Sequence, residues 1–580
     1  MFIGRKLISR CILELRKPEL PLYAIGLIGG GVIICLAVVI VRASFQAGLI
    51  PDFTAPLVLN HYYDVLLKPY FAEVALNTLA VGLGTTAVAC FFAVPAAWLL
   101  IRTDLPLKRL FFLLMFLHLV MPAFLRVMGY IMLLSPGIGL VNEVLRLFIP
   151  VEWGPLSPYN LTTIAFLQGL TLTPLLFMML AGALRLMDAT YEEAASSCGA
   201  GRFEVSRRIT LSFIRPALAA GVIYIFMLGV SLFETAALLG MPKAIHIFPT
   251  LMYLSLNPDV GVINFGIAAV YGVLLLIPLL IVLYFYQKVL RASYRYTAVT
   301  GKGYRPKMVS LGQLKWVGLS FMGVFFLLNF LLPFLAMLWA SLVPYFQMPS
   351  LEVLQQLSLS AYKSGIGIIL QGKVLTNTLQ LVLLAGLFSV IVSLAISWIV
   401  IRSRLPGRYA LDSVSMVPLA VPSAALALAI AYISLSLAGT IPIYGTVMAL
   451  VIANTVSYIP FATRTITGAF IQIHRELEEA VQISGGSVLV TIRRVVVPVI
   501  FPALLFSFIW TALLAYREVT MALFLISPDN VVLASKIWTL WEQSDIVTAA
   551  AIGVMMVVAI GTLLFILLSL FPQFFRERML

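Results

Sequence analysis

Two stretches of the chain repeat one combination of paired glutamates, small residues and a later glycine. The first copy contains Glu192, Glu193, Ala194, Ala195 and Gly199, and the second contains Glu478, Glu479, Ala480 and Gly485. Acidic side chains favour the positive N-terminal end of a helix, and a glycine can take the left-handed conformation that ends one. Each stretch therefore predicts a short, rigid helical stub.

A second group of candidates consists of ionisable residues in or beside apolar segments. Its members are Arg126, Glu234, Arg517 and Glu518. A charged group at membrane depth costs free energy and usually faces a cavity or a partner. Two interpretations remain open, a gate or substrate contact where two halves of the protein meet outside, or a structural ion pair at the external rim.

Other chemistry finds no support in the sequence. There is no G-x-x-x-x-G-K-[ST] segment to hold nucleotide phosphates. The four histidines lack the spacing of metal ligands, and no Ser-His-Asp or paired-carboxylate site falls on one face. We therefore expect no cofactor, no metal site and no catalytic residue in this chain.

The composition indicates what kind of elements must position these residues. Hydrophobic residues make up 62% of the 580 residues and charged residues only 11%. Soluble domains carry about 45–50% apolar and about 25% charged residues. Such a chain cannot cover its surface with charge, and its hydrophobicity also excludes a disordered protein. We therefore predict an all-α polytopic membrane protein.

Apolar runs long enough to cross a bilayer number twelve, at about 20 residues per helix. The first six are predicted near residues 22–41, 74–101, 110–134, 160–182, 218–240 and 264–286. The second six are predicted near residues 315–343, 376–401, 411–437, 443–463, 504–526 and 547–570.

The basic residues set the orientation of these spans. With both termini in the cytoplasm, the internal segments are 1–21, 102–109, 185–216, 287–315, 402–412, 464–503 and the tail from 571. They hold 29 of the 38 Lys and Arg residues but only 12 of the 24 acidic ones. The positive-inside rule predicts this asymmetry. The net charge of +14 thus has an explanation that needs no nucleic acid.

An internal repeat divides the chain. Asn77-Thr78-Leu79 recurs at an offset of 300 as Asn377-Thr378-Leu379, and the glutamate–glycine stretches recur at an offset of 286. We therefore predict two homologous six-helix halves, residues 1–300 and 301–580, related by an axis along the membrane normal. Each half carries one long internal loop, residues 185–216 and 464–503. The repeated asparagines are expected to hydrogen-bond between helices.

The repeated loop resembles one shared by permease subunits of type I ABC importers, with the pattern Glu-Ala-Ala-x3-Gly-x9-Ile-x-Leu-Pro. Two positions depart from it, Ser212 in place of Pro and Val481 in place of the second Ala. In that family the loop forms a coupling helix that docks on a cytoplasmic ATPase. The resemblance implies a bacterial inner-membrane permease that works by alternating access. Its implied partners are a homodimeric ATPase and a periplasmic solute-binding protein.

The solute is suggested by a narrower resemblance. As a fused two-half permease, the chain looks like the permeases for iron(III), thiamine, 2-aminoethylphosphonate and polyamines. Residues 516–525 and 134–142 are similar to segments of iron(III) permeases, which favours iron(III), with the other three solutes as alternatives. A different class, an ion-coupled secondary transporter, would instead place carboxylates near the membrane midplane and would lack paired docking loops.

Overall fold

The computed structural model describes residues 20–116, 120–148, 155–185, 187, 194–195, 197–257, 262–293, 308–440 and 442–570. In these ranges the regular structure is helical, apart from two isolated β-bridges, Gln46–Leu57 and Thr103–Val309. Helices satisfy their own backbone hydrogen bonds, as a lipid environment requires. The predicted all-α polytopic fold is confirmed.

Contacts group the chain into two compact units, each of which we describe by itself. The first comprises the described parts of Met1–Lys68, Leu251–Ile277 and Ile368–Lys536, and the second those of Pro69–Thr250, Pro278–Gly367 and Ile537–Leu580. Four helices run from one grouping into the other: α13 (Phe248–Leu256), α14 (Phe265–Ser293), α18 (Ser360–Gln371) and α27 (Leu533–Glu542).

The first unit is built around the long helices α19 and α22. Its elements are α2 (Leu20–Phe45), α3 (Asn60–Leu66), α19 (Val374–Arg402), α20 (Arg408–Val414), η7 (Val417–Leu419), α21 (Ser423–Ser436), α22 (Val447–Ile471), α23 (Arg475–Ile483), α24 (Val488–Thr491), η8 (Ile492–Val496), α25 (Val497–Arg517) and α26 (Thr520–Phe524). Ser389, Ser393 and Ser397, four residues apart on one face of α19, donate hydrogen bonds to carbonyls of α22 at 3.3–3.4 Å. Small hydroxyl residues at this spacing let two apolar helices approach closely.

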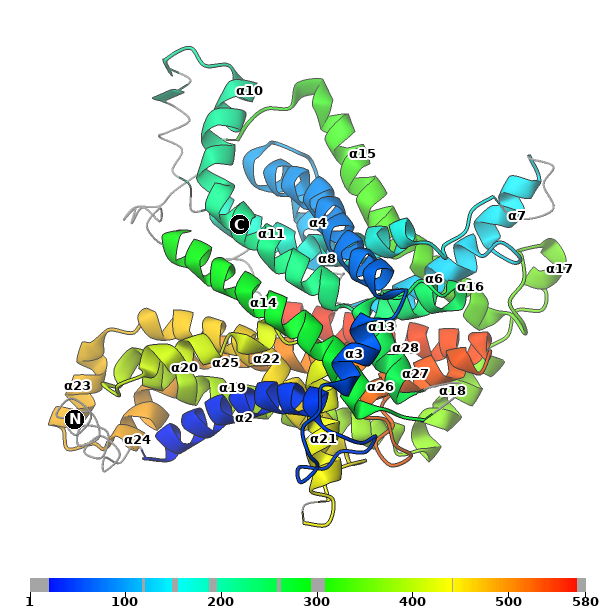
Figure 1. The fold of residues 1–580 in the computed structure, drawn as a ribbon. Coiled ribbons are helices and arrows are strands. Elements are labelled where there is room, and N and C mark those ends of the chain that lie inside the picture. Colours follow the sequence, from blue (N-terminus) through cyan, green and yellow to red (C-terminus); the bar gives the residue numbers. More distant parts are fainter. Residues whose placement is uncertain are drawn as a thin grey trace. The chain divides into compact units, whose positions relative to one another are not determined.

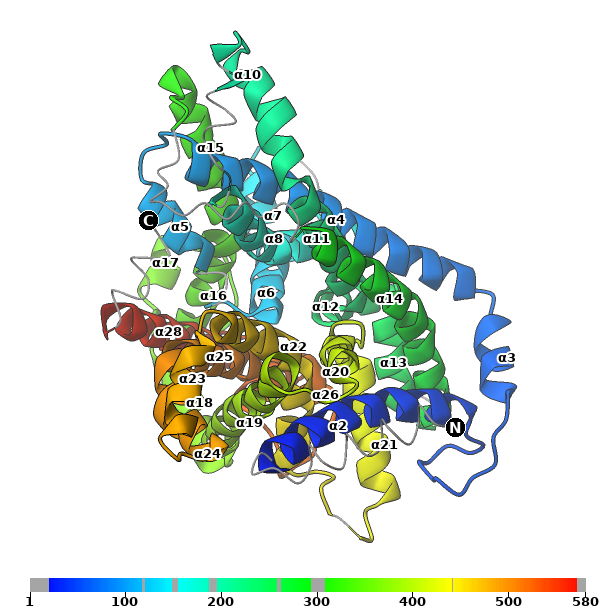
Figure 2. The ribbon, with the colours of Figure 1, turned by 90° about the vertical axis from the view of Figure 1, so that its left-hand side faces the viewer.

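The second unit is built around α4, α8 and α11, which pack side by side (Figure 2). Its elements are α4 (Phe71–Arg102), α5 (Lys108–Phe116), α6 (Ala123–Leu134), α7 (Leu140–Arg146), α8 (Leu161–Arg185), α10 (Arg202–Val205), η2 (Ser206–Thr210), α11 (Leu211–Ser231), α12 (Glu234–Gly240), η3 (Met241–Lys243), η5 (Gly312–Leu314), α15 (Lys315–Phe326), η6 (Leu327–Leu331), α16 (Leu332–Leu342), α17 (Leu351–Leu354) and α28 (Ile546–Leu570).

The opening helix of each sequence half packs within the unit formed mainly by the other half. Helix α2 lies along α19 and also contacts α21 (Figure 1). Helix α16, from the start of the second half, packs on α6 and α28. The sequence repeat and the packing units are therefore different divisions of the chain. The packing does not test the predicted boundary between the two repeats at residue 300, which stays a prediction.

In the described part of the chain, ten helices are long and apolar enough to span a membrane, or up to twelve if two bent pairs are each one span. One bent pair replaces the predicted span 411–437, because Arg408–Leu419 and Ser423–Ser436 meet at 104°. Pro422 lies at this bend, and a proline both lacks an N–H and disfavours helical conformation in the residue before it. Pro122 occupies the same place before α6.

Two other predicted spans end earlier than expected. The predicted span 218–240 stops at Ser231 and is followed by the separate α12, and 504–526 stops at Arg517 before α26. The residues after both breaks turn to extended backbone, Leu232 at ψ 128° and Glu518 at ψ 114°.

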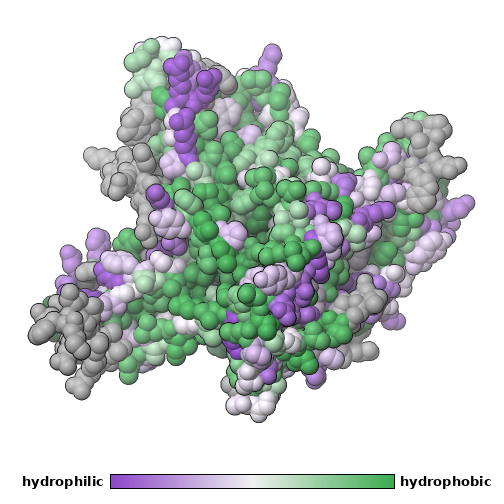
Figure 3. All heavy atoms as spheres, in the orientation of Figure 1, coloured by the Kyte–Doolittle hydropathy of each residue, from purple (hydrophilic) through white to green (hydrophobic). Residues whose placement is uncertain are grey.

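The surface matches a lipid setting. Apolar side chains cover much of the visible face in Figure 3, and hydrophilic ones gather at the free end of α10. On α2, Ile28 and Val38 are 64% and 58% exposed. Exposed apolar side chains in this quantity would be costly in water, so a lipid bilayer is the surrounding that fits them.

Candidate functional site

The second glutamate–glycine loop forms the predicted stub. Helix α23 contains Glu478, Glu479 and Ala480 and is followed by Gly485 at φ +80°. Ser484 N–H donates to the Ala480 carbonyl at 3.2 Å, and Gly486 N–H donates to the Val481 carbonyl at 2.9 Å. This is the pattern in which a left-handed glycine closes a helix and redirects the chain.

The first loop ends its helix in the same way. Gly199 has φ +85°, Cys198 N–H donates to the Ala194 carbonyl at 3.0 Å, and Ala200 N–H donates to the Ala195 carbonyl at 3.1 Å. Both hydrogen bonds recur in the second loop at the offset of 286. The predicted glycine stop is confirmed in both copies, whereas Glu192 and Glu193 lie outside the described residues.

The two glutamates of the second loop have different surroundings. Glu479 is exposed, as is Ala480, but the side chain of Glu478 is only 9% exposed. Arg402 at the end of α19 donates from Nε to Glu478 Oε1 at 2.7 Å. Nη2 of Arg402 donates to the Phe470 and Ile473 carbonyls at 3.4 and 3.0 Å, at the end of α22 and just beyond it.

Sequence reasoning missed the role of Arg402. A signal was present, because Ile101-Arg102 recurs as Ile401-Arg402 at the end of the second span of each half. Without the fold, however, an arginine at a cytoplasmic helix end is explained by topology alone.

The second loop also presents apolar side chains to solvent. Ile483 is 87% exposed and Leu477 is 49% exposed, both on α23. Helix α23 is too short and too charged to be a span, so its exposed apolar side chains suit contact with another protein.

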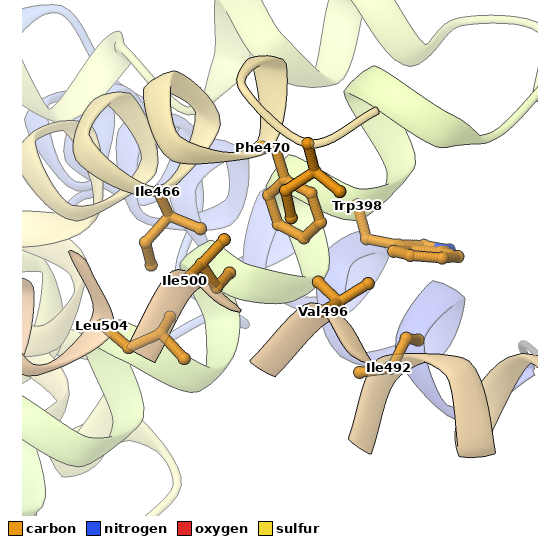
Figure 4. Close-up of a cluster of buried hydrophobic side chains, with 8 residues drawn as sticks. Trp398, Ile466, Phe470, Ile492, Val496, Ile500 and Leu504 are labelled. Atoms are coloured by element: carbon orange, nitrogen blue, oxygen red, sulfur yellow. The ribbon is translucent and has the colours of Figure 1, made fainter. Parts of the chain in front are cut away.

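A buried apolar cluster supports the base of this loop. Trp398 of α19, Ile466 and Phe470 of α22, and residues of η8 and α25 point toward one another in Figure 4. Trp398 and Phe470 meet edge to face with ring centroids 6.1 Å apart. The loop thus rests on a packed junction of three long helices.

Both loops return to the membrane through a π-helical turn. These turns, η2 and η8, occupy matching positions directly before α11 and α25. Each carries an exposed pair of arginines, Arg207 and Arg208 in the first and Arg493 and Arg494 in the second. Such turns are rare and concentrate at functional places, so their duplication marks this segment as more than a connector.

The candidate path residues fall into different surroundings. Arg126 is 0% exposed in α6; it donates from Nε to the Asn329 carbonyl at 2.7 Å and also donates to Thr171. Asn329 belongs to the π-helical turn η6, which frees carbonyls from the helix ladder. These contacts favour a helix-packing role for Arg126, and its predicted place on a path stays a prediction.

The other three path candidates lie at the breaks after the fifth spans, Arg517 and Glu518 in the first unit and Glu234 in the second. Glu518 lies between α25 and α26, where its carboxylate accepts from Met521 N–H at 3.2 Å and from the Tyr458 hydroxyl at 3.4 Å. Arg517 is half-buried at the end of α25, and Glu234 is a buried residue that opens α12. By element, Glu518 corresponds to Leu232 rather than to Glu234.

The repeated asparagine–threonine pairs hold the chain beyond these breaks. Asn377 Nδ2 donates to the Asp529 and Val531 carbonyls at 2.9 and 3.0 Å, and Leu533 N–H donates to Thr378 Oγ1 at 2.9 Å. In the other half, Asn77 donates to the His246 carbonyl at 3.4 Å, and Phe248 N–H donates to Thr78 at 3.1 Å. The expected polar contact between segments is therefore present twice.

Among the described residues, no three His, Cys, Asp or Glu side chains come together closely enough to hold a metal ion.

Known proteins resemble the chain over most of its length. The sequence profile of the binding-protein-dependent transport system inner membrane component matches residues 71–296 and again residues 391–577. The two matches fall on the two repeats and include both glutamate–glycine loops.

Three relatives illustrate the range of the similarity. A ferric transport system permease protein of Actinobacillus pleuropneumoniae is 26% identical over 86% of this chain and 72% of its own length. A Fe(3+)-transport system permease protein of Haemophilus influenzae is 23% identical over 88% of this chain and 92% of its own. A sulfate transport system permease protein of Salmonella typhimurium is 28% identical over 34% of this chain and 76% of its own.

Proposed function

Because the chain belongs to the binding-protein-dependent transport system inner membrane component family, a family of ABC importer permeases, we propose that it imports iron(III) from the periplasm into the cytoplasm. The observation that carries the coupling part is the duplicated loop, with the same glycine stop and the same hydrogen bonds in both copies. The choice of iron(III) is supported by ferric permease relatives that match both halves, whereas the sulfate relative matches about one.

In this proposal a homodimeric cytoplasmic ATPase docks on the chain, one subunit on each loop. In the second loop, exposed Glu479 and Ile483 provide a polar and an apolar contact on one short helix. Closure of the ATPase on ATP moves both loops and opens the outer side of the pore. Hydrolysis then returns the pore to the inward-open state, with both chain termini in the cytoplasm.

A periplasmic binding protein delivers iron(III) at the outer mouth. The solute is cargo here, and selectivity is assigned mainly to the binding protein. Thiamine, 2-aminoethylphosphonate and polyamines remain alternative solutes for the same machinery. The family membership gives no support to an ion-coupled secondary transporter.

Uptake in cells tests the solute. The chain is expressed with its candidate ATPase and binding protein, in a strain lacking its own iron(III) importers. We expect accumulation of radioactive iron(III) citrate that stops when the ATPase is inactivated. Accumulation of sulfate or spermidine instead of iron would contradict the iron assignment and leave the permease class intact.

A further inference from the structure

Helix α23 is attached to the membrane helices by one buried guanidinium. The Arg402 side chain is 10% exposed, and it binds Glu478 of α23 while also capping carbonyls beside the end of α22. Arg402 is itself the last residue of α19. One side chain therefore joins three helices at the point where the loop leaves the membrane.

The guanidinium of Arg402 fixes the angles between the groups that it binds, and this matters more here than the attraction between opposite charges. A guanidinium presents several N–H groups in a rigid plane, so it holds a carboxylate and carbonyls at set angles. A buried ion pair contributes little net stability, because desolvation offsets the attraction, but it can specify one arrangement. The neighbouring Glu476 and Glu479 are exposed, unlike Glu478.

We propose that Arg402 is a positioning residue that, through Glu478, couples movement of α23 to α19 and α22 when the ATPase moves the loop. The inference rests on the proposed function. The apolar cluster beneath the loop makes α19, α22 and α25 one packed body, and α23 also contacts η8 at the start of α25. The ion pair adds the polar link that fixes α23 on the ends of α19 and α22, so that α23 and this body move together. Residues of the same types, Arg102 and Glu192, recur in the first half, where Arg102 is 1% exposed and Glu192 lies outside the described residues.

A distance measurement across the two halves tests the inference without knowing the solute. In a background in which the four cysteines are replaced by serine, spin labels are attached at Thr162→Cys and Met448→Cys, matched exposed positions near the starts of α8 and α22. The distance is measured by pulsed electron paramagnetic resonance on the complex with its ATPase in lipid nanodiscs. Samples with and without ATP and vanadate are compared, and ATP hydrolysis is followed in parallel.

In the wild-type complex we expect ATP and vanadate to shift the label distance. In Arg402→Gln we expect continued binding and hydrolysis by the ATPase, with the equilibrium for the shifted state reduced about tenfold. In Glu478→Ala we expect the same reduction of the shifted state. The double variant is expected to be no worse than Arg402→Gln, because both substitutions break one link. Arg402→Lys keeps the charge without the planar fork and is expected to be intermediate.

Arg404→Gln and Glu476→Ala are the matched controls, since both side chains are exposed close to the junction. The inference is overturned if Arg402→Gln and Arg402→Lys both shift as the wild type does, or if the double variant is additive. A wild-type chain that neither binds an ATPase nor shifts would instead overturn the proposed function, and the inference with it.

Discussion

At the scale of single residues, the two loop glycines are constrained by backbone conformation alone. Gly485 has φ +80°, and a Cβ built there would meet no atom within 4 Å. Gly199 has the same open surroundings at φ +85°. A larger side chain is therefore disfavoured only through its dihedral angle, which makes these positions clean tests of the helix stop.

Gly485→Val is expected to weaken ATPase binding, because a β-branched residue in the left-handed region costs about 1–2 kcal/mol and would redirect the loop. Gly485→Asn is the matched control, since asparagine tolerates that conformation. Binding of the purified ATPase to the detergent-solubilised chain measures both. Equal binding by the valine and asparagine variants would show that the glycine stop does not shape the docking surface.

Arg126 is expected to be a stability residue in α6. Arg126→Met removes the donor to the Asn329 carbonyl and to Thr171 in a fully buried place, and should lower the free energy of unfolding by about 2 kcal/mol. Thermal unfolding of the solubilised chain measures this. If Arg126→Met has wild-type stability but no longer transports, this stability role is wrong and a role on the translocation path is favoured.

At the scale of elements, the repeated asparagines hold the segments that follow the broken fifth spans. Asn377 makes two hydrogen bonds at 2.9 and 3.0 Å, whereas Asn77 makes one at 3.4 Å. Asn377→Ala should therefore destabilise the chain by about 1–2 kcal/mol, and Asn77→Ala by clearly less. Chemical denaturation followed by tryptophan fluorescence checks the order, and the reverse order would contradict the hydrogen-bond assignment.

The connection between α4 and α15 predicts a dependence on pH. Leu311 N–H donates to the Asp104 carboxylate at 2.8 Å, and this hydrogen bond lowers the pKa of Asp104 below its ordinary value. A carboxylate with a lowered pKa contributes stability above its ordinary pKa and loses it as the pH falls through the lowered one. The melting temperature of Asp104→Asn should lie below that of the wild type at neutral pH. That difference should vanish in acid, and a difference that persists there would contradict the assignment.

Helices and loops were predictable from the sequence to different degrees. Apolar length predicted the long spans, and the repeated glycines predicted where both loop helices end. The bend before α21 was not predicted, although Pro422 lies at it. A count of apolar residues takes no account of the backbone N–H that proline lacks, and so misses the interruption of the helix. Arg402 could not be recognised as a junction residue because its partners, Glu478 and the carbonyls at the end of α22, lie 68 to 76 residues away and meet it only through packing.

At the scale of the molecule, repeat and packing divide the chain differently. The profile matches fall on the two repeats, whereas α2 packs with α19 and α21 of the opposite half. Helix α16 packs with α6 of the opposite half and with α28 of its own. Because the opening helix of each half packs within the unit formed mainly by the other half, each unit contains helices from both halves. In the proposed function, the duplicated loops provide one docking place for each subunit of a homodimeric ATPase.

Native mass spectrometry of the complex extracted from its own membrane tests this account most directly. The account predicts one copy of the chain bound to two copies of one ATPase subunit, with loss of both copies when Gly199 and Gly485 are replaced together by valine. A chain that carries one ATPase copy or none, or that keeps both copies in the double variant, would contradict it.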